Sequence, residues 1–196
     1  MSLARRGRSI TLLGFLLAGA IGIISSTQTW LTVDRADAGA QILVPGASAL
    51  VLLAPLSLAV LALGAALSIA GRPLRVIFAV LAAAAALFLG WSTLQILISV
   101  PLSAVGPTVT EVTGLAGGPA VDSVVASVTP TIWPVLALVG WVLLLLAAVF
   151  ALATWRRWKV GGRRYRTGDD NSAPADGPVD AIDSWDDLSR GTDPTR

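Results

Sequence analysis

Polar side chains inside an otherwise apolar run are the first place where this sequence could do chemistry. The stretch 91-WSTLQ-95 contains an indole, two hydroxyls and an amide. Trp91 and Gln95 are four residues apart, so in a helix they share a face, and with Ser92 they could line a site for an aromatic ligand. The alternative, which we favour, is that these polar residues hydrogen-bond to residues 25–28 of a neighbouring helix.

A second candidate lies near the carboxyl terminus, in 184-SWDDLSRG-191. Ser184 can cap the start of a helix, and Asp187, three residues later, can complete a capping box. Trp185 and Leu188 then share one face of a short helix that is unstable alone but suits the groove of a partner protein. The alternatives are insertion of the ring into the inner leaflet and a tail with an isolated Trp. The candidate partner-binding residues are Trp185, Asp187, Leu188 and Gly191.

The residue types that most often carry catalysis and metal binding are missing. The chain has no Cys and no His, which excludes thiolate chemistry and removes the commonest general base and metal ligand. Its four long apolar runs contain no Asp, Glu, Lys or Arg, and such residues usually mark proton relays and ion sites in membranes. We therefore predict a protein that is not an enzyme, with no catalytic residue, no cofactor and no metal site.

The composition is that of a membrane protein. Hydrophobic residues make up 55% of the chain, and the mean hydropathy is +0.76. Each apolar run is close to the ~20 residues that cross ~30 Å of hydrocarbon as a helix, and backbone amides cannot stay unpaired in lipid. The predicted fold is an all-α integral membrane protein with four transmembrane helices, and the polar stretch above becomes an intramembrane polar site. The helices are predicted at residues 10–27, 48–70, 76–100 and 132–154.

The first apolar run also resembles the core of a signal peptide, because basic residues precede it. The stretch 23-IISSTQTW-30, however, offers no clear small-x-small cleavage site. We therefore expect residues 10–27 to be retained as a membrane anchor.

The positions of Lys and Arg predict the orientation of the helices. Of the 14 Lys and Arg residues, all but three fall in residues 1–9, the turn 71–75 or the segment 155–166. Positively charged loops stay in the cytoplasm, so both termini and this turn are predicted there. Residues 28–47 and 101–131 are then outer loops.

Aromatic residues mark the expected membrane boundaries. Trp favours the interface between water and lipid, and residues 155–166 combine rings with cations that suit an anionic inner leaflet. From residue 167 to residue 196 the chain is too polar to bury a core, so we predict a disordered cytoplasmic tail. The predicted membrane-interface anchors are Trp30, Trp133, Trp155 and Trp158.

Small residues recur at four-residue spacings within the apolar runs. Examples are Gly14, Ala18 and Gly22 in the first run, and Gly64 and Ser68 in the second. Such spacings let helix backbones approach closely. We interpret them as packing inside one chain, with a dimer seam as the alternative.

Four short motifs give the chain a family resemblance. They are 28-QTWLTV-33, 128-VTPTIWP-134, 155-WRRWKVGGRRYR-166 and 185-WDDLSRGTDPT-195. With these motifs, the sequence resembles the actinobacterial tryptophan-biosynthesis-associated transmembrane protein family along nearly its full length. The resemblance implies a link to tryptophan-pathway genes, and it carries over no catalytic residues.

Two functional hypotheses follow. In the first, the chain is a non-enzymatic accessory protein of tryptophan metabolism whose tail recruits a cytoplasmic protein partner to the membrane. In the alternative, it is a small permease or exporter for tryptophan, indole or anthranilate, with Trp91 and Gln95 at the site. A structural membrane protein unrelated to tryptophan is a third interpretation. The predicted partners are the lipid bilayer, the cytoplasmic protein and, in the permease hypothesis, a second copy of the chain; no nucleic acid is expected.

Overall fold

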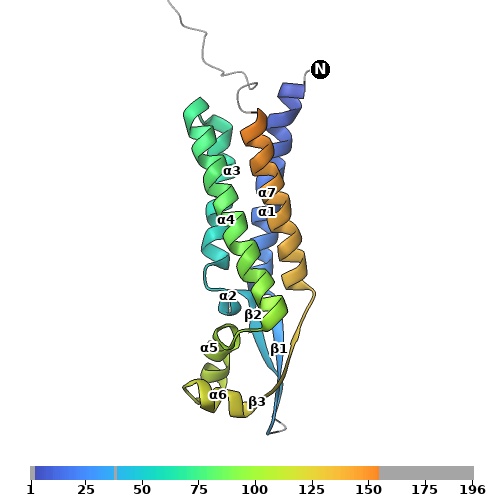
Figure 1. The fold of residues 1–196 in the computed structure, drawn as a ribbon, viewed down its shortest axis with the longest axis vertical. Helices are drawn as coiled ribbons and strands as arrows, with labels where there is room; N and C mark the ends of the chain where they lie inside the picture. The colour runs from blue at the N-terminus through green and yellow to red at the C-terminus, as the bar shows by residue number, and fades with distance from the viewer. Residues whose placement is uncertain (1–2, 38, 155–196) are drawn as a thin grey trace, which may run out of the picture. The chain divides into compact units, whose positions relative to one another are not determined.

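The computed structural model of the chain describes residues 3–37 and 39–154, all of which belong to one compact unit, Met1–Gly161. Four helices run side by side in a bundle (Figure 1). They are α1 (Leu3–Thr27), α3 (Leu53–Ile69), α4 (Arg72–Ser99) and α7 (Trp133–Thr154).

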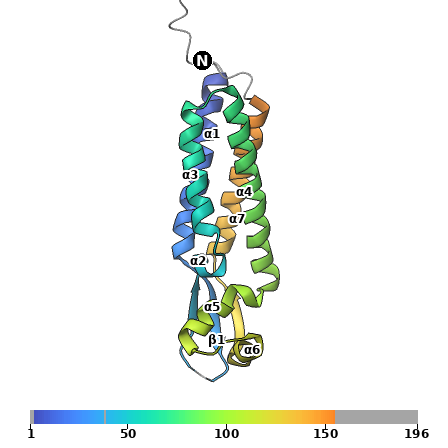
Figure 2. The same cartoon turned by 90° about the vertical axis from the view of Figure 1, so that its left-hand side faces the viewer.

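The helices pack in a definite order around the bundle. Helix α1 packs against both α3 and α7, and α7 packs in turn against α4, whereas α3 and α4 share a much smaller contact. The start of α1, the α3–α4 connection and the end of α7 lie at the same end of the bundle, as Figure 2 shows from the side. A small cluster there joins Leu67, Ala79 and Ala151 from three of the helices. We call this end the turn end.

Close helix contacts in the bundle depend on glycine. A Cβ atom added at Gly14 would lie 2.7 Å from the Ala147 Cβ, and one at Gly64 would lie 3.0 Å from the Phe15 Cβ. At Gly22 it would lie 2.6 Å from a ring carbon of Trp141. The prediction of packing within the chain is therefore confirmed for Gly14, Gly22 and Gly64.

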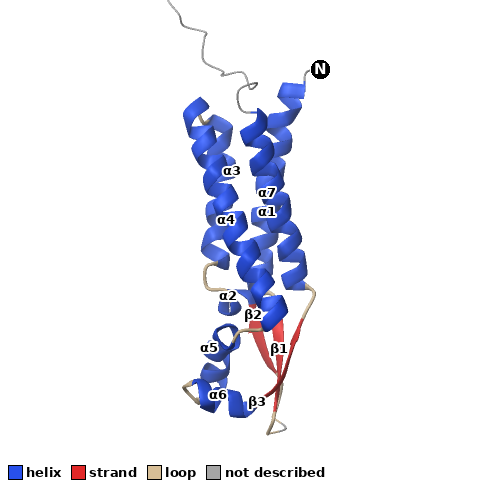
Figure 3. Cartoon of the chain, in the orientation of Figure 1, coloured by secondary structure: helices blue, strands red, loops and turns tan. Residues whose placement is uncertain are grey.

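The opposite end of the bundle carries a small mixed structure, which we call the headpiece. It contains the strands β1 (Thr29–Arg35), β2 (Ile42–Pro45) and β3 (Val125–Pro130), and the short helices α2 (Gly46–Ala49), α5 (Leu102–Thr113) and α6 (Gly118–Val124). The strands form an antiparallel sheet in the order β2-β1-β3, drawn in red in Figure 3. In this sheet Val33 of β1 pairs with Ile42 on one side and Val128 on the other.

The all-α prediction is therefore wrong, although the described residues are mostly helical. The two segments predicted as outer loops, residues 28–47 and 101–131, contain the sheet, α5, α6 and the start of α2. Strand β3 pairs with β1 across roughly ninety residues of chain, and the local sequence of a strand does not reveal so distant a partner. Hydropathy distinguishes apolar from polar segments, but it does not distinguish a loop from a strand or a short helix among the polar ones.

The second predicted span, residues 48–70, also differs from the structure. Leu50 is extended, with φ −139° and ψ 93°, and separates α2 from α3. The 17 residues of α3 rise only about 26 Å, less than the ~30 Å of a typical hydrocarbon core. Within the described ranges, three helical segments are long and apolar enough to cross a membrane. These are Ser9–Thr27, Pro73–Ser99 and Trp133–Thr154.

The contact at Gly22 gives a direct test of the bundle. We expect Gly22→Ala to lower the free energy of unfolding by about 1–3 kcal/mol, because the new methyl group overlaps Trp141 and the buried Ser57. The measurement is thermal unfolding of the purified protein in detergent micelles. Gly90→Ala is the matched control, since its Cβ would meet only the Trp141 Cβ at 3.7 Å. Equal stability of the two variants would contradict this packing.

Candidate functional site

The stretch 91–95 is divided by its helix into a buried and an exposed part. Thr93 is 0% exposed; its hydroxyl donates to the Leu89 carbonyl at 2.7 Å and accepts from Trp141 Nε1 at 3.3 Å. Trp91 is 64% exposed and Gln95 is also exposed, while Ser92 is half-buried. The indole and amide of the candidate intramembrane polar site therefore lie on the outer surface of the bundle.

The expected partners in residues 25–28 bind elsewhere. Ser25 Oγ accepts a hydrogen bond from Trp30 Nε1 at 2.9 Å and lies 3.4 Å from the Trp133 carbonyl oxygen, to which it donates. The hydroxyls of Ser26 and Thr27 donate to carbonyls of their own helix. No side-chain hydrogen bond joins 91–95 to 25–28 in the part of the chain that the structure describes, so the predicted partner residues are wrong. The predicted bond to a neighbouring helix is present for Thr93, which accepts from Trp141 of α7.

Trp30 is a core residue rather than a membrane-interface anchor. Its side chain is 0% exposed, and it lies where α1 passes into β1. A Cβ at Gly46 would lie 2.6 Å from Trp30 Nε1, so the ring is enclosed by protein and cannot reach lipid headgroups. Trp133 is half-buried, and the anchors predicted at Trp155 and Trp158 lie outside the described residues.

Asp34 joins three parts of the headpiece on its exposed side. The carboxylate accepts hydrogen bonds from Ser127 Oγ at 2.7 Å and from Gln41 Nε2 at 2.6 Å. The bond from Ser127 is the main cause that lowers the pKa of Asp34, and the bond from Gln41 adds to it. Because these partners come from β3 and from the residue before β2, Asp34 cross-links the sheet. The sequence placed Asp34 in an outer loop without this role.

The neighbouring charged residues of the headpiece form a local pair. Arg35 donates to Asp37 through two nitrogens, one of them at 2.9 Å. The hydrogen bond to Arg35 is the main cause that lowers the pKa of Asp37, and the same bond raises the pKa of Arg35. Both groups stay charged at neutral pH, so neither is suited to act as a general acid or base.

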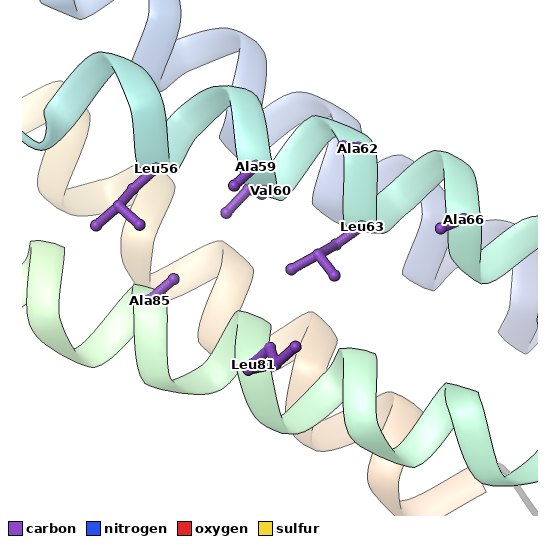
Figure 4. A pocket seen from close by; sticks show the side chains of 8 residues that line it. All are labelled: Leu56, Ala59, Val60, Ala62, Leu63, Ala66, Leu81 and Ala85. Atoms are coloured by element: carbon purple, nitrogen blue, oxygen red, sulfur yellow. The ribbon is translucent and has the colours of Figure 1, made fainter.

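The bundle has a groove between α3 and α4. Its volume is about 440 Å³. Figure 4 shows Leu56 and Leu63 projecting from α3 toward Leu81 and Ala85 of α4. We call this surface the α3–α4 groove; it is lined by Leu56, Ala59, Val60, Ala62, Leu63, Ala66, Leu81 and Ala85. Every lining side chain is aliphatic, so the groove can bind only apolar groups.

The described residues contain no cluster of metal-binding side chains. Among the described residues, no group of three or more His, Cys, Asp or Glu side chains lies close enough to hold a metal ion. The candidate partner-binding residues Trp185, Asp187, Leu188 and Gly191 lie outside the described residues.

A helical bundle of this apolarity, with three segments long enough to cross the bilayer, defines a multi-pass integral membrane protein. The chain belongs to the family of tryptophan-associated transmembrane proteins, whose family model matches residues 12–195. The family resemblance predicted from the four motifs is thereby confirmed. A search of curated proteins and a search of solved structures each found no match to the chain.

The bond between Thr93 and Trp141 leads to a prediction about the bundle core. We expect Thr93→Val to lower the free energy of unfolding by about 1 kcal/mol, because Trp141 Nε1 loses its acceptor at little change in volume. A double-mutant cycle with Trp141→Phe isolates the bond. The two substitutions should be less than additive in thermal unfolding, and full additivity would show that the bond contributes nothing.

The Asp34 cross-links lead to a prediction about pH. In Ser127→Ala, the pKa of Asp34 should rise toward its ordinary value of 3.8, because the main stabilising bond to the carboxylate is lost. Nuclear magnetic resonance titration of the Asp34 carboxyl carbon measures this directly. Ser123→Ala is the control, since the Ser123 hydroxyl bonds to the Ala120 carbonyl instead.

The sign of the accompanying stability change follows from linkage. The pKa of Asp34 is lower in the folded protein than its ordinary value, so its carboxylate stabilises the fold above pH 3.8, and this contribution is lost as the pH falls through the folded pKa. Unfolding of the headpiece at acid pH should therefore depend less on pH in Ser127→Ala. An unchanged titration midpoint would contradict the hydrogen-bonding scheme.

Proposed function

We propose that this protein is a non-enzymatic accessory protein of tryptophan metabolism that recruits a soluble partner to the cell membrane. In this proposal the bundle is a fixed membrane platform. The cytoplasmic tail is the recruiting element, and Trp185 and Leu188 provide its apolar contacts. Asp187 and Gly191 would delimit the short helix that presents them.

The packing of the bundle supports a platform rather than a pathway. Phe15, Trp141 and Leu144 fill its centre and are 0–2% exposed. The buried hydroxyls of Ser57 and Thr93 are hydrogen-bonded within the chain. A carrier for a zwitterion needs polar groups along its route, whereas the groove between α3 and α4 is wholly aliphatic and has no partner for a carboxylate or an indole N–H.

The proposal includes four membrane crossings and a cytoplasmic location for both termini. Helix α3 lies along α1 at three levels, where Gly64 meets Phe15, Gly19 meets Leu61 and Gly22 meets Ser57. We therefore take α3 as the fourth, shorter crossing. The start of α1 and the α3–α4 connection lie at the turn end, and residues 155–166 follow α7 in the sequence. The positive charge of residues 1–9, 71–75 and 155–166 favours the cytoplasmic side for this end. The headpiece then lies outside.

The alternative, a permease for tryptophan, indole or anthranilate, rests on the exposure of Trp91 and Gln95. On one chain these side chains face away from the bundle and enclose nothing. A site built from them would need a second copy of the chain against α4. The alternative therefore predicts a homo-oligomer, which the platform does not require.

Deletion of residues 183–196 separates the two functions. We expect the deletion to abolish crosslinking of the partner to a photoreactive residue at position 180, which the deletion keeps, and the double variant Trp185→Ala and Leu188→Ala to do the same. The change removes both apolar contacts of the proposed recruiting helix. The double variant Ala173→Ser and Ala181→Ser, which alters the same tail without touching that helix, should keep the crosslink. Each strain is also tested for growth without tryptophan.

Transport is tested in parallel with the purified protein. Vesicles that contain it should not accumulate labelled tryptophan faster than empty vesicles. Tryptophan uptake that falls in Gln95→Ala would contradict the platform and support the permease. A tail deletion that grows and crosslinks like the parent strain would contradict recruitment.

A further inference from the structure

We propose that the α3–α4 groove binds one acyl chain of an anionic phospholipid, whose headgroup lies at the turn end of the bundle. The inference goes beyond the proposed function and does not depend on it, since it requires only that the bundle lies in a membrane.

The form of the groove suits an extended alkyl chain. Its α3 residues run from Leu56 to Ala66, a rise of about 15 Å along the helix. Alanine side chains at 59, 62, 66 and 85 create the hollow, and the longer Leu63 and Leu81 border it (Figure 4). The groove is therefore long, narrow and free of hydrogen-bonding groups.

Neither water nor an empty space suits such a surface. Water needs two to four polar partners to occupy a protein cavity, and no side chain that lines this groove is polar. An empty groove would deprive its lining atoms of dispersion contacts. In a bilayer, acyl chains surround the bundle and are the most abundant apolar groups at this depth.

The volume of the groove suits an acyl chain and is too small to admit a whole helix between α3 and α4. A helix segment about 15 Å long and 10 Å wide occupies roughly 1,200 Å³, whereas the groove holds about 440 Å³. Helices α3 and α4 are also joined by Ala70 and Gly71 alone, which keeps them close at the turn end. A helix would not fit between them, while an alkyl chain can.

Positive charge near the turn end of the groove favours a lipid with an anionic headgroup. Residues 1–9, 71–75 and 155–166 contain eleven Arg and Lys and no Asp or Glu. The first two segments lie at the turn end, and the third follows Thr154 in the sequence. Arg75 is buried, so it is not counted among the basic residues that can face a lipid. Basic residues at a membrane surface attract anionic lipids. A phospholipid with its chain in the groove and its phosphate at this end combines both interactions.

The test uses the full chain in nanodiscs of equal parts phosphatidylglycerol and phosphatidylcholine with identical acyl chains. Native mass spectrometry identifies the lipids that stay bound to the protein after its release from the nanodisc. We expect a single bound phospholipid, enriched in phosphatidylglycerol, and a weaker enrichment as the ammonium acetate concentration rises. Equal retention of the two lipids would overturn the assignment of the headgroup.

Two substitutions fill the groove and one does not. Ala66→Phe and Ala85→Phe place a ring where the chain would lie, so most of the bound phospholipid should be lost. Ala65→Phe is the matched control, because Ala65 is exposed on α3 outside the groove lining and should leave retention unchanged. Unchanged retention in both groove variants would overturn the site. A two-chain species that either groove variant dissociates would show instead that a second copy covers it.

A measurement on the unaltered protein guards against misfolded variants. Phosphatidylglycerol with a diazirine in its acyl chain is reconstituted with the protein, free lipid is removed by detergent exchange, and the sample is irradiated. Adducts should then concentrate on peptides containing residues 56–66 and 81–85. Adducts spread evenly over the exposed faces of α4 and α7 would overturn the proposal.

Discussion

The close approach of α1 to its neighbours is the contact on which the rest of the bundle depends. Gly14 and Gly22 bring α1 against α7, and Gly64 of α3 receives Phe15 of α1. In lipid there is no hydrophobic driving force between helices, so association relies on packing and on hydrogen bonds. Glycine supplies the packing, and the Thr93–Trp141 bond adds a polar contact between α4 and α7. Because α1 and α7 occupy the centre of this arrangement, α3 and α4 lie on either side with a groove between them.

The headpiece extends the same connection beyond the bundle. Strand β1 follows α1 and strand β3 precedes α7, and the two strands pair with each other. The sheet therefore joins the two central helices a second time. Trp30 fills the junction, where its N–H bonds to Ser25, which in turn donates to the Trp133 carbonyl. The segments that connect the helices outside the bundle are therefore folded, and β1 and β3 continue directly from α1 and into α7.

The distribution of polar groups explains why a fixed platform is the better functional interpretation. Buried hydroxyls in the bundle bond to nearby carbonyls or to the indoles of Trp30 and Trp141. In the headpiece, Arg35 pairs with Asp37 on the exposed side. None of these arrangements opens a polar route through the helices that the structure describes. The α3–α4 groove is apolar throughout, which matches a lipid chain better than a polar metabolite. The membrane then takes part in the fold, because a lipid completes the packing that α3 and α4 leave unfinished.

The amino-acid sequence by itself determined the membrane environment, the approximate position of the apolar helices, the small-residue packing and the family. Each follows from composition, from local spacing or from short motifs. A run of about twenty apolar residues matches the thickness of the hydrocarbon core, so it can be recognised from the sequence alone. Only the tertiary structure decided that residues 28–47 and 101–131 build a sheet, that Trp30 is buried and that Thr93 rather than Gln95 bonds across the bundle. The β1–β3 pairing, the Ser25–Trp133 contact beside Trp30 and the Thr93–Trp141 bond join residues about fifty to a hundred positions apart, and the local pattern of either partner does not reveal the other. The groove is also a feature that only the tertiary structure reveals, because it lies where the faces of α3 and α4 do not pack against each other.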